Sequence, residues 1–163
     1  MPLLPDETQV QRESASIIFT EEETRRLIHL HNDALVVVLK IANGQVFPIL
    51  VDIGSLVDIL LAYQNMNIGG AVLRPSKTSL YGFAEECVHH EGVIGLPITF
   101  GEGSAAITQI VDFQVVDQRL AYNTIISRPI LNKLSTVVST YHLILKFPIE
   151  EGVEVIEGDQ TLA

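Results

Sequence analysis

The chain has 163 residues, of which 47% are hydrophobic, and a formal net charge of -10 at pH 7. This length suits a single domain with a sizeable core. The acidic balance argues against a nucleic-acid partner, because an acidic surface repels phosphates.

Cysteine content and hydropathy narrow the protein class further. Cys87 is the only cysteine, which excludes an intrachain disulfide and favours a reducing compartment. No apolar run reaches the roughly 18 to 20 residues of a membrane span. Residues 1–12 lack the basic start and apolar run of a signal peptide. We therefore expect a soluble, cytoplasmic protein with no membrane partner.

The first part of the chain is polar. Residues 1–14 carry two prolines and no periodicity, so we expect a flexible lead-in, such as the cut end of a longer polyprotein. The domain itself is expected over residues 15–148, beginning with a short strand at 16–19. Thr20 and Glu23 have the spacing of a capping box, which predicts a short helix over 21–27.

The next segment predicts a hairpin. Residues 33–42 and 45–51 are apolar and rich in β-branched side chains, and Asn43-Gly44 between them is a strong hairpin signal. The second strand leads directly into Asp52. A short helix is expected over 56–66, ended by the glycine pair at 69–70.

The remainder again predicts short strands. They are expected at residues 78–81, 92–100, 105–116, 122–126, 137–139 and 142–147, with a small helix over 129–134 that begins at Pro129. Residues 149–163 are expected to form an acidic tail or linker. Many closely spaced short strands with a few small helices indicate a mainly β barrel or sandwich.

The stretch around Asp52 carries the clearest chemical signal. An apolar run over 48–51 ends in Asp52-Ile53-Gly54-Ser55, and a second apolar run follows. This pattern predicts a buried strand that delivers a carboxylate to a tight loop. Aspartic proteases present their catalytic acid in this way, on an Asp-Thr/Ser-Gly loop. The alternative is an ordinary turn aspartate, because Asp and Gly are both favoured in turns.

Six blocks of sequence carry a family resemblance. They are HNDALVV (31–37), ILVDIGS (49–55), LYGF (80–83), GVIGLP (92–97), YNTIISRP (122–129) and VSTYHL (138–143). In this order and spacing, the chain resembles, over roughly residues 17–158, the protease domain of plant Ty3/gypsy-type retrotransposon polyproteins. That domain is a member of the retropepsin group of aspartic proteases.

The resemblance implies a retropepsin-like closed barrel with one or two short helices and no cofactor. The sequence has a single Asp-x-Gly loop, so activity implies a homodimer that brings Asp52 of each copy together at a two-fold axis. The two carboxylates would share one proton and activate water to hydrolyse a polypeptide substrate. In the family pattern Asp58 belongs to the following helix and is not a second catalytic acid.

The resemblance also assigns two supporting segments. The flap that covers substrate corresponds to Tyr81, Gly82, Phe83 and Ala84, with Gly82 supplying backbone freedom. A segment that packs behind the catalytic loop corresponds to Ile125, Ile126, Ser127 and Arg128. Without the resemblance, this second segment reads as a core strand followed by a turn.

This chain departs from the family pattern at functional positions. Ile53 replaces the Thr or Ser whose hydroxyl bonds across the dimer axis, and Ser127 replaces a Gly. If that Gly needs positive φ, the Cβ of Ser127 would strain the loop. The flap also lacks a second glycine after Phe83. The first alternative to a protease is therefore a catalytically degenerate retropepsin-like domain that only dimerises or binds. The second is an unrelated small β barrel that binds a ligand or partner.

Histidines offer no convincing metal site. His29 and His31 have a spacing that would place both rings on one face of a strand, with Asp33 nearby. No cysteine pair or His-Glu-x-x-His helix accompanies them, and adjacent His89 and His90 would point to opposite faces of a strand. We therefore expect no metal.

Overall fold

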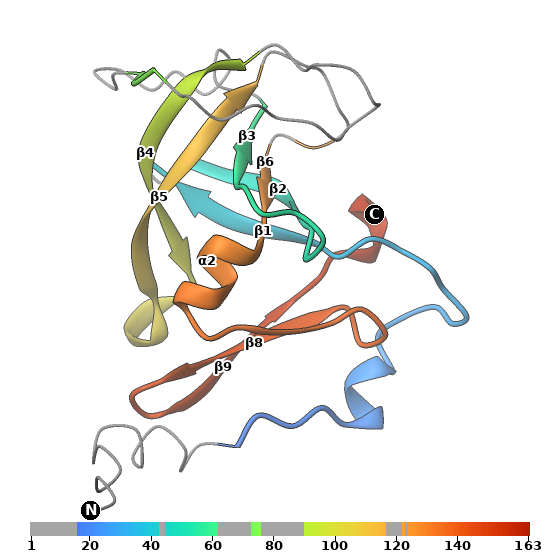
Figure 1. Ribbon diagram of the computed structural model, residues 1–163. Coiled ribbons are helices and arrows are strands. Elements are labelled where there is room, and N and C mark those ends of the chain that lie inside the picture. Colours follow the sequence, from blue (N-terminus) through green and yellow to red (C-terminus); the bar gives the residue numbers. More distant parts are fainter. Residues whose placement is uncertain (1–15, 43–44, 62–72, 76–89, 117–121, 123) are drawn as a thin grey trace, which may run out of the picture.

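The structure, a computed structural model, describes residues 16–42, 45–61, 73–75, 90–116, 122 and 124–163. Six strands close into a barrel in the order β1-β2-β6-β3-β5-β4 (Figure 1). Their bounds are β1 Val36–Ile41, β2 Gln45–Val51, β3 Ile59–Leu60, β4 His90–Phe100, β5 Ile107–Val116 and β6 Thr124–Ile126. The predicted mainly β closed barrel is therefore confirmed.

The hairpin of β1 and β2 forms as its local sequence predicts. The two strands pair antiparallel, with Val38 opposite Pro48. β2 then pairs in parallel with β6, so that Val51 lies opposite Ile126. Because the strands are parallel, their carboxyl ends meet at the same edge of the barrel, and this edge carries Asp52.

The hairpin of β4 and β5 supplies much of the barrel wall. The two strands pair antiparallel from His90–Val116 to Phe100–Ile107, with a bulge between His90 and Gly92. Phe100 and Phe113 are fully buried in the core. Gly92 has φ of +148°, and a Cβ there would lie 2.7 Å from the carbonyl oxygen of Arg74, so the bulge requires glycine. Both predicted strands are confirmed.

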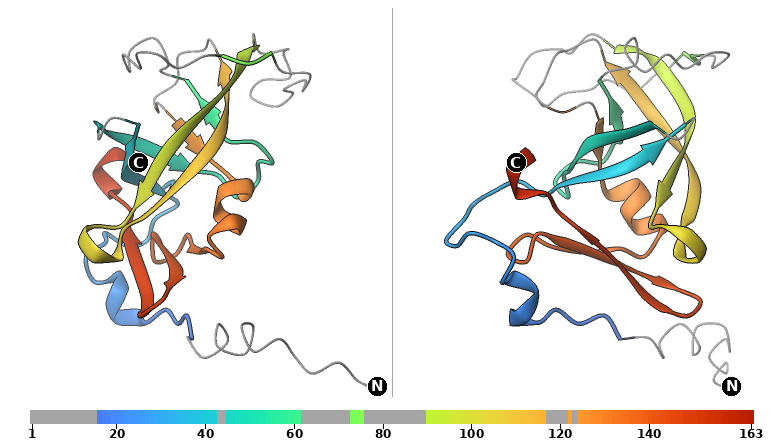
Figure 2. Two further views of the ribbon diagram at one scale, coloured as in Figure 1. Left: turned by 90° about the vertical axis from the view of Figure 1, so that its left-hand side faces the viewer. Right: turned by 180° about the vertical axis from the view of Figure 1, so that it is seen from behind.

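A second, three-stranded sheet lies beyond helix α2. α2 spans Arg128–Lys133, and the sheet consists of β7 Val137–Ser139, β8 Ile144–Ile149 and β9 Gly152–Glu157 in that order. Figures 1 and 2 show α2 between the barrel and this sheet. A short 3-10 helix, η4, spans Gln160–Leu162.

The expectation of an acidic tail over residues 149–163 missed β9. This segment carries four glutamates, but apolar residues are interspersed with them, and Ile156 packs against the core. β9 forms because β8 offers it a complete antiparallel partner, from Ile144–Glu157 to Ile149–Gly152. The fold therefore continues beyond residue 148.

The N-terminal segment contains less regular structure than its sequence suggests. Residues 16–20 form no strand, and the predicted helix over 21–27 is a 3-10 helix, η1, limited to Glu21–Thr24. The backbone N–H of Thr20 donates to the Glu23 carboxylate at 2.8 Å, as the capping box predicts. Just beyond the end of η1, the Arg26 guanidinium donates to the carbonyl oxygens of His142 and Leu143, at 3.0 and 2.6 Å.

The helix predicted over residues 56–66 is wrong in its described part. Residues 56–58 form a loop, and Ile59–Leu60 is strand β3, held between β5 and β6. A short apolar run fits either a buried strand or a helix, and here tertiary pairing decides. The strand predicted at 78–81 lies outside the described residues. A 3-10 helix, η3, spans Gly103–Ala105, between β4 and β5.

In the described part of the chain, none of the helices is both long enough and apolar enough to cross a lipid bilayer.

Lys146 fastens the N-terminal segment to the second sheet. The residue is 7% exposed, and its ammonium group lies 2.7 Å from the carbonyl oxygen of Ile18 and 2.8 Å from the Glu23 carboxylate. It also lies 4.8 Å from the centre of the Phe19 ring. The hydrogen bond from Lys146 lowers the pKa of Glu23.

Replacing Lys146 by Met is expected to lower the free energy of unfolding by about 2 kcal/mol at pH 7, because buried acceptors lose a charged donor. The lowered pKa of Glu23 means that its share of this stability is present above its unfolded pKa. That share is lost as the pH falls through its folded pKa. Denaturant titrations should therefore show a deficit that shrinks below about pH 4.5. Lys133→Met, at an exposed position, is the control; an equal deficit there would contradict the assignment.

Candidate functional site

Asp52 lies where β2 and β6 end side by side. Its backbone N–H donates to the carbonyl oxygen of Ile126 at 2.9 Å, which extends the β2–β6 ladder by one bond. The Asp52 side chain is half-buried, and its Oδ1 accepts the backbone N–H of Gly54 at 2.9 Å. A Cβ on Gly54 would lie 3.2 Å from this oxygen. Glycine therefore leaves the Asp52 carboxylate room for its hydrogen bond.

The loop after Asp52 is closed by its own side chains. The Ser55 hydroxyl donates to the carbonyl oxygen of Val57 at 3.1 Å and lies 3.3 Å from the Val57 N–H, which donates to it. Ile53 and Leu56 are 53% and 70% exposed. The loop thus presents one carboxylate flanked by two apolar side chains that are more than half exposed. The same local bonds also fit an ordinary Asx-turn.

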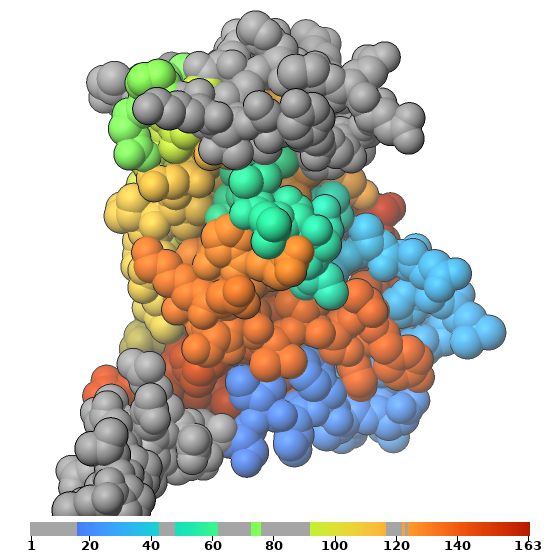
Figure 3. Space-filling view, in the orientation of Figure 1, coloured from blue at the N-terminus to red at the C-terminus, as the bar shows by residue number. Residues whose placement is uncertain are grey.

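The predicted support segment does contact this loop. Ile125 and Ile126 are fully buried, and the backbone N–H of Arg128 donates to the carbonyl oxygen of Ser55 at 3.4 Å. The guanidinium Nε of Arg128 donates to the same oxygen at 3.3 Å. The segment over residues 126–128 therefore holds both ends of the Asp52–Ser55 loop. Figure 3 shows this loop region, in teal, against α2, in orange.

Ser127 does not strain the backbone as its sequence position suggested. Its φ is -138° and its ψ is -170°, an extended conformation that any residue adopts. Its hydroxyl, however, is buried and has no hydrogen-bond partner within the described part of the chain. A buried hydroxyl without a partner costs about 1 to 3 kcal/mol. Serine in place of glycine therefore buries a hydroxyl group without a partner, but it does not strain the backbone.

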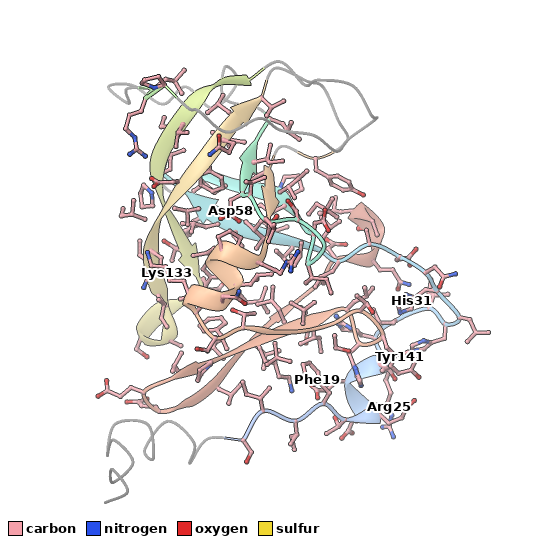
Figure 4. The ribbon with its side chains drawn as sticks, viewed as in Figure 1. Phe19, Arg25, His31, Asp58, Lys133 and Tyr141 are labelled. Atoms are coloured by element: carbon pink, nitrogen blue, oxygen red, sulfur yellow. The ribbon has the colours of Figure 1, made fainter. Side chains whose placement is uncertain are left out.

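Asp58 is the residue at this site that sequence reasoning missed. The expectation placed it on a helix, but it lies in the loop just before β3 and is only 3% exposed (Figure 4). Its Oδ1 accepts the backbone N–H of Ser127 at 2.7 Å, and the N–H of Ile130 also donates to the carboxylate. Burial raises the pKa of Asp58 to about 6. An acidic residue inside the apolar run 56–61 was the available signal.

The titration of Asp58 predicts a change of stability with pH. Its folded pKa of about 6 lies above the ordinary 3.8, so its stabilising contribution is complete below pH 3.8 and is lost as the pH rises through 6. Asp58→Asn removes this titration. Relative to that variant, the free energy of unfolding of the unaltered chain should fall by about 3 kcal/mol between pH 3.5 and 7.5. Denaturant titrations across this range measure it, and parallel curves for the two proteins would refute it.

The histidines considered as metal ligands have other partners. Nε2 of His29 lies 3.0 Å from the carbonyl oxygen of Thr24, and Nε2 of His31 lies 3.0 Å from that of Tyr141. The rings of His29 and Tyr141 stack with centres 5.5 Å apart. Across the described residues, no group of three His, Cys, Asp or Glu side chains is arranged to hold a metal ion. These rings instead join the 28–33 loop to the second sheet.

The predicted flap residues Tyr81, Gly82, Phe83 and Ala84 lie outside the described residues, as does His89. Their assignment stays a prediction.

Comparisons with known proteins bear on the fold. No protein-family model matches the chain, and no curated protein matches it. Among solved structures, the retroviral protease-like domain of Ddi1 from Leishmania major matches with a TM-score of 0.56 and 16% identity, covering 79% of this chain and 96% of that one. EIAV protease complexed with the inhibitor HBY-793 matches with a TM-score of 0.47 and 18% identity, covering 69% of this chain and 99% of that one. The match to the Ddi1 domain shows that the chain has a retropepsin-like fold.

Proposed function

We propose that this chain is one half of a homodimeric aspartic endopeptidase that acts on a retrotransposon polyprotein of the Ty3/gypsy type. The observation that carries the activity is the position of Asp52: it lies on a glycine-containing loop, hydrogen-bonded to Ile126, at the joint end of β2 and β6 in a retropepsin-like fold. The retrotransposon context rests on the six sequence blocks described above.

The chemistry needs two copies of the chain. The sequence holds one Asp-x-Gly loop, so a second carboxylate comes from a second copy related by two-fold symmetry. Two carboxylates a few ångströms apart share a single proton. The ionised Asp52 acts as general base on a water molecule held between them, and the protonated Asp52 polarises the substrate carbonyl. No covalent intermediate or cofactor is required.

The exposed side chains beside Asp52 fit such an arrangement. Ile53 and Leu56 are apolar and largely uncovered, and a second copy would bury them. Ile53 cannot make the hydrogen bond that Thr or Ser makes across the axis in the family. The dimer loop would therefore be held by apolar contact instead, with less directional control of Asp52. The proposed flap, Tyr81 to Ala84, would cover the bound polypeptide.

Cleavage of an unstructured protein between pH 4 and 7, at high chain concentration, tests the proposal. The unaltered chain should cleave it best at acid pH, and Asp52→Asn should lower the rate by about 1,000-fold or more, because the dyad loses its base. Asp112→Asn removes an exposed carboxylate of β5, which pairs with Arg74, and serves as the matched control. Cleavage that survives Asp52→Asn would contradict the proposal.

Two further variants separate a working enzyme from a degenerate domain. Ile53→Thr should raise kcat about tenfold, since a restored hydrogen bond of 1 to 3 kcal/mol reorders the loop. Ser127→Gly is added to it as the double reversion. Cleavage by the double revertant alone would mean that the fold persists here as a dimerising or binding module.

A further inference from the structure

Asp58 is a buried carboxylate that the proposed cleavage chemistry does not use. It is 3% exposed, and the side chains around it that the structure describes supply no ion-pair partner. An unpaired charge inside a protein is costly unless donors satisfy it. Its donors are the backbone N–H groups of Ser127 and Ile130, at the start of α2.

These bonds connect Asp58 to Asp52 through one short segment. Ser127 is the middle residue of the segment 126–128, and its N–H lies 2.7 Å from Asp58 Oδ1. On one side, the Ile126 carbonyl oxygen accepts the Asp52 N–H at 2.9 Å. On the other, Arg128 donates twice to the Ser55 carbonyl oxygen. A shift of Ser127 would therefore move both anchors of the Asp52–Ser55 loop.

A second contact fixes Asp58 itself. Its carbonyl oxygen accepts the N–H of Gln114 on β5 at 2.8 Å, and the next two residues form β3, between β5 and β6. The carboxyl group is thus attached to the rigid barrel wall. It can hold the 126–128 segment against that wall.

We propose that Asp58 is a positioning residue for Asp52, acting through Ser127 to hold the segment 126–128 on which the Asp52 loop rests. Its value for catalysis depends on the proposed function, whereas its effect on the order of the loop does not.

The positioning is sensitive to pH. The charged groups on the packed elements are otherwise engaged: Arg128 contacts Ser55, Lys133 contacts Ile110, and Asp112 pairs with Arg74. Asp52 accepts the Gly54 N–H. When the Asp52–Ser55 loop is closed, Asp58 is buried and holds its proton more tightly than it does when hydrated. Opening of the loop, which hydrates Asp58, therefore becomes easier as the pH rises through about 6.

Backbone amide hydrogen exchange on the free protein tests the proposal by NMR. Asp58→Leu removes the acceptor and should speed exchange of the Asp52 amide about tenfold at pH 5, with the β8 amides of Lys146 and Phe147 unchanged. Asp58→Asn keeps a carbonyl acceptor for Ser127 and should restore near-normal protection. The unaltered chain should lose protection at Asp52 between pH 5 and 7.5, whereas Asp58→Asn should not. The two proteins differ at one residue, so the difference between their pH profiles isolates Asp58. Asp112→Asn is the matched control.

Specific outcomes would overturn the proposal. In Asp58→Leu, faster exchange at Ser127 with an unchanged Asp52 amide would show that Asp58 only caps α2. Equal acceleration at Lys146 would show a purely global loss of stability. If Asp58→Leu does not fold, identical pH profiles at Asp52 for the unaltered chain and Asp58→Asn would overturn it.

The cleavage assay is a second, independent measurement on the same variants. In the cleavage assay, Asp58→Leu should lower kcat about tenfold with KM changed less than twofold, because the base is misplaced while substrate contacts persist. If the unaltered chain cleaves nothing, the proposed function fails, and the exchange comparison still decides the role of Asp58.

Discussion

The parallel pairing of β2 with β6 is the constraint on which the rest of the arrangement depends. It connects the first hairpin of the chain to a strand more than 70 residues later, with Val51 opposite Ile126. The next bond along, from the Asp52 N–H to Ile126, fixes the start of the acidic loop. Because β6 runs directly into α2, the same pairing also brings the second sheet under the barrel (Figure 2). The position of Asp52 and the packing of the second sheet against the barrel thus both depend on the pairing of β2 with β6.

Two buried charged side chains, Lys146 and Asp58, hold neighbouring segments of the fold in place, and they do so differently. Lys146 meets an opposite charge, Glu23, so its burial is compensated. Among the described residues, Asp58 accepts hydrogen bonds only from backbone N–H groups. These bonds do not fully offset the cost of burying its charge, so its pKa is raised. The ion pair of Lys146 with Glu23 holds the N-terminal segment on the second sheet. The unpaired carboxyl group of Asp58 instead makes the order of the nearby loop depend on pH. In an enzyme that works at acid pH, the second device would favour order where activity is needed.

Sequence reasoning succeeded where structure is decided locally. The pairing of β1 with β2, the strand leading to Asp52 and the helix α2, with Pro129 in its first turn, each have a turn or cap signal in the sequence within a few residues. It failed where distant pairing decides. The pair Ile59–Leu60 became β3 only because β5 and β6 flank it, and β9 formed despite its glutamates because β8 accepted it. Asp58 was misplaced for the same reason, since its donors lie some 70 residues away.

The central claim is that activity requires Asp52 from two copies of the chain, and mixing tests it most directly. A fixed amount of unaltered chain is combined with a ninefold excess of Asp52→Asn chain, allowed to exchange subunits, and assayed for cleavage, with an unrelated protein of similar size as the control addition. Random pairing leaves about one tenth of the unaltered chains with an unaltered partner, so activity should fall about tenfold. Unchanged activity would show that each chain acts alone and would contradict the account.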